Sequence, residues 1–396
     1  MTADKPVDST LSLFERAAGV FDGWTDPDTG VRALRVFPPG IPVMPGRFST
    51  VYHQSRCFLD GGRRVLLRET TPEGHCYVLL DLVTGVVEHA FPPAYAVVEV
   101  HDESKYALLT TEDSNGKRVV IRDMNTGQET ASVHTEGWFL SSSIFLADGR
   151  RAVVTHTDGN DRREYRRTHF HLLATGEAPR IFLELEGVHA NHLLGSPTDP
   201  NLVAYDAWPA PLRDVDQVIT LVSLHSRINE RVKLDDNALR PPELWGVRDH
   251  YVWTPDGTRI VSYLNRRKLE LRAPFNHFEF DWWLSALDWR TGADLSAQYP
   301  PGRWGGHMQV TPDSRYILCC GGPGFDKLFA VEIAGLQRGW NEHIICSYPK
   351  TMPKGDNEDP FPYPFALPDG SGVIFNAGWP GVNHGVYLAA WPTGLR

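Results

Sequence analysis

The chain has few cysteines and no long apolar run, and each shortage excludes a class of protein. Its 396 residues include five cysteines, an odd number that does not suit the disulfide framework of a small secreted domain. No apolar stretch approaches the roughly 18 residues of a transmembrane helix, and the first twenty residues lack the apolar core of a signal peptide. No His/Cys grouping has zinc-finger spacing. We therefore expect a cytoplasmic protein with no membrane partner.

Positive charge is also scarce. Lys and Arg number 39 against 49 Asp and Glu, a formal net charge of -10. A nucleic-acid partner is not expected, because neutralising phosphates requires a basic face. The hydrophobic share of 41% and the charged share of 22% are those of a globular protein. The 35 glycines and 30 prolines indicate many turns.

One pattern recurs along the chain. A short apolar strand is followed by an Asp/Gly-rich turn and then by a strand rich in β-branched residues. The turn aspartates lie about 40 to 60 residues apart and are Asp60, Asp102, Asp148, Asp199, Asp256, Asp313 and Asp369. Each blade of a β-propeller has four short antiparallel strands, which needs about this many residues. The sequence therefore predicts an all-β, seven-bladed propeller.

A second signal is a pair of strands joined by a Thr-Gly turn. It occurs between the repeats and once more near the N-terminus, in the segment from Asp26 to Phe37. We expect residues 31–37 to complete the last blade and so close the ring. The predicted organisation is an N-terminal extension, residues 1–25, with a short helix at Leu11–Ala18, followed by one propeller domain, residues 26–396.

The rim of the channel should collect the starts of the innermost strands and the ends of the strands that return beside them. Four repeats carry a histidine at nearly the same place, at His53, His192, His250 and His307. A single such histidine is more often a hydrogen-bonded structural residue. Its recurrence favours a shared site at the centre.

The segments around His189–Ser223, Arg248–Leu264 and Gly305–Ser314 resemble those of the oligogalacturonate lyases in motif order and spacing, across roughly residues 26–396. These are seven-bladed propeller enzymes that cleave short pectin fragments in the cytoplasm. Their His-Glu-Phe-Trp motif corresponds to His250-Tyr251-Val252-Trp253. The resemblance implies that His250 is the catalytic base and that His307 corresponds to a manganese ligand.

Several positions depart from that family. Its His-Pro-His metal pair reads Phe361-Pro362-Tyr363, its glutamine ligand is Glu358, and a site arginine is Val218. The pattern is similar to that of the metal-independent ulvan and rhamnose-glucuronate lyases, which use His, Tyr and Arg in place of a metal. The resemblance therefore implies no metal and no cofactor, with manganese at His307 as the alternative.

Lyase cleavage of a uronate chain is β-elimination. It needs groups that neutralise the C6 carboxylate, a base for the C5 proton and an acid for the leaving O4. We assign His250 as base or base-orienting group, Tyr251 or Tyr363 as acid, and His192 as a further catalytic residue. The substrate-binding residues are expected to be His53, Arg56, Arg266, Arg267, Trp208, His307 and Gln309. The substrate would be a short acidic oligosaccharide, since the net charge does not attract polyanions from afar.

Two other functions stay open at this stage. A propeller that only binds carbohydrate would need no acid–base pair. A glycoside hydrolase on the same scaffold would need two carboxylates flanking the scissile bond, and the expected rim offers only Glu99, Asp206, Asp249 and Glu358.

Overall fold

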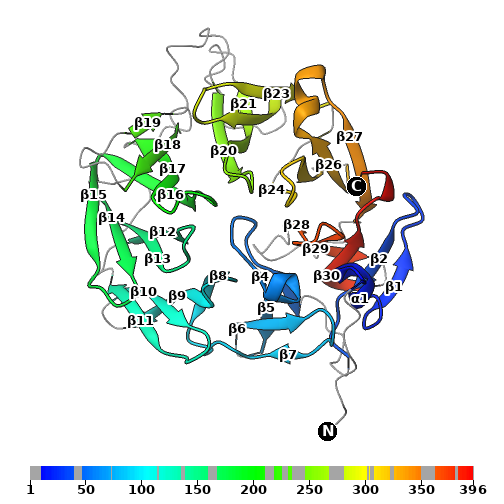
Figure 1. Cartoon of the computed structure of the whole chain (residues 1–396), viewed down its shortest axis with the longest axis horizontal. Coiled ribbons are helices and arrows are strands. Elements are labelled where there is room, and N and C mark those ends of the chain that lie inside the picture. The colour runs from blue at the N-terminus through cyan, green and yellow to red at the C-terminus, as the bar shows by residue number, and fades with distance from the viewer. Residues whose placement is uncertain are drawn as a thin grey trace.

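The chain folds into an all-β propeller, in which antiparallel sheets surround a central axis (Figure 1). The computed structural model describes residues 10–39, 47–72, 74–113, 116–134, 139–158, 167–209, 218–224, 231–233, 246–266, 281–300, 303, 307–321, 325–348, 362–379 and 382–395. Within these residues no helix is long and apolar enough to cross a membrane. The strands of the described part form seven sheets, five with four strands and two with five.

Four of the sheets follow one another without interruption. They consist of β8 (Ala96–His101), β9 (Tyr106–Asp113), β10 (Gly116–Asp123) and β11 (Glu129–His134); β12 (Phe139–Phe145), β13 (Arg151–Thr157), β14 (Arg167–Ala174) and β15 (Arg180–Glu186); β16 (Val188–Gly195), β17 (Leu202–Pro209), β18 (Val218–Ser223) and β19 (Arg231–Lys233); and β20 (Gly246–Trp253), β21 (Arg259–Arg266), β22 (Asp281–Asp288) and β23 (Asp294–Gln298).

Of the remaining three sheets, one repeats this four-stranded pattern and the other two have five strands each. They consist of β3 (Phe48–Thr50), β4 (Phe58–Leu59), β5 (Arg64–Thr71), β6 (Gly74–Asp81) and β7 (Val87–Glu88); β24 (Met308–Val310), β25 (Tyr316–Cys320), β26 (Lys327–Glu332) and β27 (Glu342–Ser347); and β28 (Phe365–Ala366), β29 (Gly372–Trp379) and β30 (Val382–Ala390) with β1 (Asp22–Thr25) and β2 (Arg32–Arg35). Short 3-10 turns occupy Asp60–Gly62, Ile333–Arg338 and Thr393–Leu395.

The Thr-Gly turns join outer strands as the sequence predicts. In the turn after β6, the carboxylate of Asp81 accepts hydrogen bonds from the backbone N–H of Val83 and of Thr84. Gly85 follows with a φ of 72°, a conformation that costs glycine nothing. The same local chemistry recurs from Asp123 and from Asp288. An Asx turn with a left-handed glycine thus reverses the chain at three outer hairpins.

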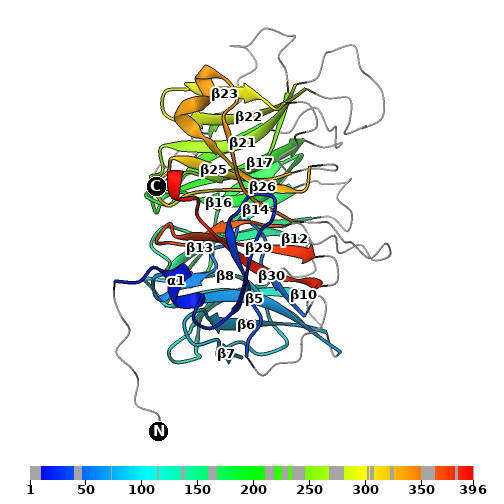
Figure 2. The ribbon, with the colours of Figure 1, turned by 90° about the vertical axis from the view of Figure 1, so that its right-hand side faces the viewer.

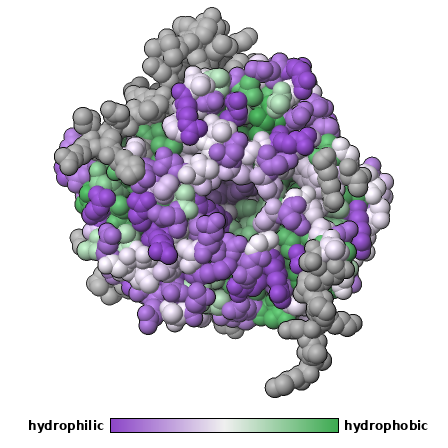
Figure 3. Space-filling view, viewed as in Figure 1, coloured by the Kyte–Doolittle hydropathy of each residue, from purple (hydrophilic) through white to green (hydrophobic). Residues whose placement is uncertain are grey.

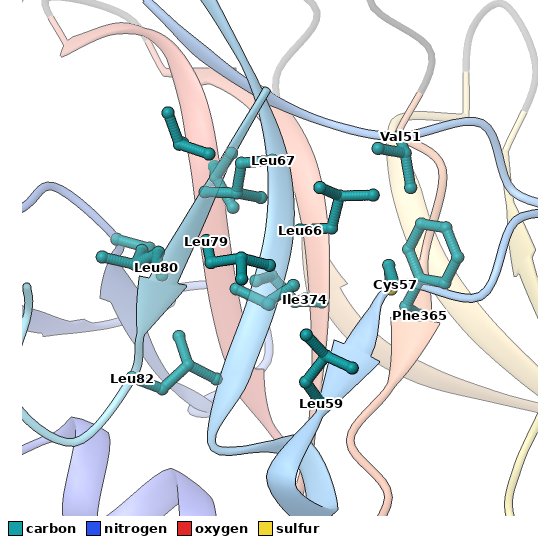
Figure 4. Packing of buried hydrophobic residues seen from close by; sticks show 14 of the residues in the cluster. Val51, Cys57, Leu59, Leu66, Leu67, Leu79, Leu80, Leu82, Phe365 and Ile374 are labelled. Carbon is teal, nitrogen blue, oxygen red and sulfur yellow. The ribbon is translucent and has the colours of Figure 1, made fainter. Parts of the chain in front are cut away.

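The hydrophobic core lies between the faces of neighbouring sheets. Figure 4 shows leucines of β5 and β6, among them Leu66 and Leu79, packed against Ile374 of β29 and Phe365 of β28. These four side chains are at most 4% exposed. Alternating apolar side chains on facing sheets interdigitate in this way, and their burial drives the sheets together.

The N-terminus and the C-terminus share one sheet. Strand β2 pairs antiparallel with β30, with Leu34 opposite Leu388, and β1 pairs with β2. The sheet therefore begins before residue 26, within the segment expected to be an extension.

The short helix α1 (Leu13–Ala17) lies where the sequence predicts one, with Ser12 and Glu15 forming a capping box. Its first backbone N–H, from Leu13, donates to the carboxylate of Asp369 at 2.7 Å. In the edge-on view of Figure 2, α1 lies on the left-hand face of the molecule.

Asp26 connects the hairpin of β1 and β2 to the sheet formed by β24–β27, and its removal is expected to destabilise the fold. Its fully buried carboxylate accepts a hydrogen bond from the Ser347 backbone N–H at 2.8 Å, in addition to the bonds of its own turn. Asp26→Ala leaves that buried donor unpaired, which should lower the free energy of unfolding by about 2 kcal/mol. Urea denaturation measures the loss. Asp123→Ala is the matched control, because Asp123 makes the same kind of turn but, within the described residues, its carboxylate bonds only to that turn. Equal losses in both variants would contradict the expectation.

Candidate functional site

A loop of the sheet formed by β3–β7 reaches into the centre of the ring. Strands β3 and β4 both pair with β5, and the residues between them, 51–57, leave the sheet (Figure 1). Tyr52 and His53 lie on this loop. Sequence reasoning expected them at the start of an inner strand, but the structure places them between two short strands.

The loop is held by glutamines at two points. The side-chain amide of Gln54 donates to the backbone carbonyl of Tyr251 at 2.9 Å. The amide of Gln309 donates to the carbonyl of His53. Gln309, expected to bind substrate, thus supports the backbone of the loop.

Six aromatic side chains from five sheets meet at the centre, and we call them the histidine–tyrosine cluster. Neighbouring ring centroids lie between 4.4 and 6.4 Å apart. Its members are Tyr52, His53, His192, His250, His307 and Tyr363. The face seen in Figure 3 is hollowed near its centre and bordered mostly by hydrophilic residues. The four histidines that recur in the repeats therefore do converge.

Three members of the cluster have unusual backbone conformations. His192, His250 and Tyr363 have φ values of 45°, 47° and 36°, in the left-handed region that favours glycine. The register of β16 shifts between Asn191 and Leu194, and that of β20 shifts between Asp249 and Val252. A β-bulge with a left-handed residue turns a side chain out of the normal alternation of a strand. Such strain is concentrated at functional sites.

Each of two histidines is anchored through Nδ1 by a residue of the returning strand. Nδ1 of His192 lies 2.5 Å from Oδ2 of Asp206, whose carboxylate is fully buried. Nδ1 of His250 lies 2.6 Å from the hydroxyl of Tyr263. Because a carboxylate only accepts hydrogen bonds, the His192 proton resides on Nδ1, and Nε2 is the nitrogen that can accept another.

Two other histidines are held neutral. Burial lowers the pKa of His307 to about 2, and the neighbouring His250 and His192 add to the effect. Burial also lowers the pKa of His53 well below its usual value, with contributions from His307, His250 and His192. Both side chains are at most 6% exposed. Near neutral pH they can donate or accept a hydrogen bond but do not carry charge.

The assignment of Tyr251 as a site residue is corrected by its position. Its side chain is fully buried, and its hydroxyl donates to the backbone carbonyl of His192 at 2.5 Å. The bulge at His250 sends His250 to the centre, while Tyr251 packs into the core toward Leu194 and Leu221. Tyr251 is therefore a support for His192.

Arg56 also points into the protein, because its guanidinium donates to the carbonyl of Leu146 at 3.1 Å, and its backbone N–H faces the buried carboxylate of Glu99.

The structure does not test the positions of three further residues that were expected to bind substrate. Trp208 and Arg266 belong to β17 and β21, but their side chains lie outside the described part of the structure, as does the whole of Arg267.

Sequence reasoning missed Tyr263 and gave Asp206 no role. A signal for both exists, because the anchoring residue follows its partner by 14 positions for His192 and by 13 for His250. The same spacing joins Cys320 to His307, where the thiol lies 3.5 Å from the histidine carbonyl. The second strand of a repeat thus supplies the support for the residue that opens the first.

Tyr251→Phe is expected to disturb His192 without loss of the fold. It removes the hydroxyl that holds the His192 carbonyl, at a cost of about 1 to 2 kcal/mol in the free energy of unfolding, and it frees the backbone of a site residue. Tyr348→Phe is a matched control, because the buried Tyr348 hydroxyl likewise donates to a carbonyl, that of Gly321. Denaturation should show similar losses, whereas the NMR signals of the His192 ring should shift only in Tyr251→Phe. An equal shift in both variants would contradict this.

The described residues near His307 retain only part of the manganese site that the resemblance implies. His307 is at one ligand position, but the second histidine of the His-Pro-His pair is replaced by Tyr363, whose phenol lies among the four imidazoles of the cluster. The carboxylate near the cluster, Asp206, is bonded to His192. Glu358 and Phe361, which correspond to metal-ligand positions in the resemblance, lie outside the described residues.

Comparison with known proteins shows the fold. No family model and no curated relative matches the chain. A solved oligogalacturonate lyase in complex with manganese aligns with a TM-score of 0.71 and 17% identity, over 94% of this chain and 96% of that one. An oligogalacturonate lyase from Vibrio parahaemolyticus aligns with a TM-score of 0.72 and 16% identity, over 95% and 98%. The chain has the propeller fold of these lyases. Hydrazine synthase of Kuenenia stuttgartiensis is more distant, with a TM-score of 0.53, 15% identity, and coverage of 88% and 97%.

Proposed function

We propose that the protein is a lyase that cleaves a short uronate-containing oligosaccharide by β-elimination at the histidine–tyrosine cluster. One observation carries the proposal: two histidines, each anchored at Nδ1, meet two tyrosines at the centre of the ring. Elimination needs a base and an acid that act near neutral pH, and imidazole and phenol can be tuned to these tasks. The fold likeness to oligogalacturonate lyases agrees with this chemistry.

His192 is the better candidate for the base, and His250 a second one. A buried carboxylate on Nδ1 stabilises the imidazolium that forms when Nε2 takes the C5 proton. His250 has a neutral partner, Tyr263, which orients the ring without adding charge. We assign Tyr363 as the acid that protonates O4, because its ring lies 4.6 Å from that of His307 and 5.6 Å from that of Tyr52. Tyr251 has no part in proton transfer.

The C6 carboxylate of the substrate needs donors around it. His307 is neutral, so its N–H group can donate without the cost of burying a charge. The fully buried His53 lies behind it, with ring centroids 4.6 Å apart, and supports its ring. Arg266 and Arg267 would supply positive charge. We route no step through a metal ion, because Tyr363 replaces a histidine ligand that the resemblance implies.

The scaffold of the site is proposed to be a closed seven-bladed ring. The seven sheets of the described part would be its blades. The pairing of β2 with β30 and the bond of Asp26 to Ser347 support closure by the N-terminal strands. A closed ring leaves no open sheet edge and fixes the distances between residues of different blades.

The test is an assay for the 4,5-unsaturated uronate that β-elimination creates, followed by its ultraviolet absorbance. Pectic, ulvan, glycosaminoglycan and gum oligosaccharides form the panel, each with and without a strong chelator. We expect product from at least one oligosaccharide, with the rate unchanged by the chelator. Absence of product across the panel defeats the lyase proposal, and loss of rate with the chelator defeats its metal-independent form.

A propeller that only binds carbohydrate is the second candidate. The neutral, buried state of His53 and His307 favours it, since such residues bind without proton transfer. Binding of an oligosaccharide from the panel with no product would support this reading. A glycoside hydrolase is not favoured by the described carboxylates, because Asp206 and Glu99 are buried behind other side chains and cannot flank a sugar bond. The side chains of Asp249 and Glu358 lie outside the described part of the structure.

A further inference from the structure

A second group of reactive side chains lies on the first sheet, apart from the central cluster. Glu69 of β5 stands directly opposite Cys76 of β6, so both side chains are on one face of the sheet. His89 immediately follows β7, at the outer side of the same sheet. Within the described residues this is the one group of three or more His, Cys, Asp or Glu whose ligand atoms all lie within 4.8 Å of one another.

We propose that Glu69, Cys76 and His89 bind a borderline-soft divalent cation of the zinc class. The set combines a thiol, an imidazole and a carboxylate, which are the three protein ligands that zinc accepts. Sγ of Cys76 lies 3.6 Å from Oε2 of Glu69, and Nδ1 of His89 lies 3.8 Å from the same oxygen. Around tetrahedral zinc with ordinary bond lengths these separations are about 3.5 and 3.3 Å. The third pair, Sγ of Cys76 and Nδ1 of His89, lies within 4.8 Å, and tetrahedral zinc brings such a pair to about 3.5 Å. The atoms therefore need to move by about an ångström or less.

Arg47 prepares the carboxylate for this role. Its Nε and Nη2 both contact Oε1 of Glu69, at 2.8 and 2.7 Å. Oε1 is thereby occupied, while Oε2 faces the thiol and the imidazole. The Glu69 side chain is 2% exposed, so its orientation is fixed by packing as well as by Arg47. Hydrogen bonds of this kind orient ligating carboxylates in metal sites.

The exposure of the three residues gives the ion a path. Glu69 is buried, Cys76 is half-buried, and the His89 side chain is 63% exposed. The ion would enter from solvent at His89, and a water molecule would be its fourth ligand. Zinc binds the thiolate form of cysteine, so binding displaces the Cys76 thiol proton to solvent.

Untagged protein freed of metal with a chelator is titrated with cobalt(II), which reports sulfur ligation through a charge-transfer band in the near ultraviolet. We expect one cobalt ion per chain, displaced by zinc, and a zinc-dependent rise in Tm. Cys76→Ser should abolish the band, and His89→Gln should weaken zinc binding by about tenfold or more. His89→Gln is a surface change that leaves the core intact.

His75→Gln is the matched control, because His75 is adjacent in sequence but on the opposite face of β6, where it contacts Thr70. It should bind as the wild type does. Absence of the sulfur band in the wild type overturns the proposal. So does binding that survives His89→Gln unchanged, or that is lost in His307→Gln, since the ion would then lie elsewhere. None of these measurements depends on cleavage of a sugar, so the site and the proposed lyase function can fail separately.

Discussion

Asp206→Asn should reduce kcat by about 10² to 10⁴, the range that general acid–base catalysis supplies. The amide is nearly the same size as the carboxylate, so the fold is kept, but the charge that stabilises the His192 imidazolium is removed. The amide can also present its NH₂ group to Nδ1, which would put the His192 proton on Nε2, the nitrogen that must be empty. Steady-state rates with the best substrate of the oligosaccharide panel measure the effect.

The double variant Asp206→Asn/His192→Gln separates catalysis from folding. If Asp206 acts through His192, the double variant is no slower than His192→Gln alone, because residues that act as one unit have non-additive effects. Additive losses, or a fall in kcat below tenfold for Asp206→Asn, would remove Asp206 from the mechanism. Tm values of all three variants should stay close enough to the wild type for assay at 25 °C.

The second large effect is expected from mild acid, which should destabilise the fold. His53, His307 and His156 are buried, and burial lowers the pKa of each, to about 2 for His307 and about 3 for His156. Below pH 6.5 the unfolded chain binds protons at these positions and the folded chain does not, so stability falls as pH falls. At pH 5 the loss is about 2 kcal/mol for His307 and the same for His156, and His53 adds to it. Together these groups can remove much of a typical stability of roughly 5 to 15 kcal/mol.

Urea denaturation at several pH values between 7.5 and 5 measures this loss. His156→Gln should reduce the slope of stability against pH by about 1.4 kcal/mol per unit, because one proton fewer is taken up on unfolding. His156 packs against His171 in the sheet formed by β12–β15, outside the histidine–tyrosine cluster, so this variant leaves the cluster in place. Buried Glu99 works in the opposite sense, since burial raises its pKa. A stability curve that is flat from pH 7 to pH 5 would contradict the buried neutral state of the histidines.

Some features of the fold and site follow from the sequence because they are local. The outer hairpins at Asp81, Asp123 and Asp288 depend on a carboxylate and a glycine a few residues apart, and both can be read directly from the sequence. The convergence of His192, His250 and His307 follows from their equal place in each repeat, since a ring brings equivalent positions together.

Other features depend on contacts between distant segments. Because of the bulge at His250, His250 faces the centre and Tyr251 faces the core. A sequence read as a regular strand does not reveal this bulge. The position of the loop 51–57 depends on two hydrogen bonds between sheets. Gln54 of the loop donates to the carbonyl of Tyr251, and Gln309 donates to the carbonyl of His53 in the loop. No periodicity within the first repeat encodes a partner about 200 residues away.

The sheet shared by the two termini has a consequence for synthesis of the chain. The hairpin of β1 and β2 ends at Arg35, but the strand that it joins, β30, begins only at Val382 and is made much later. At roughly 5 to 20 residues per second, about 20 to 70 seconds separate the two. For that time the edge of β2 that will pair with β30 has no native neighbour, and an unpaired edge readily pairs with another chain. The β1–β2 hairpin of the nascent polypeptide is therefore exposed to aggregation during synthesis, and a chaperone that covers it would be of use.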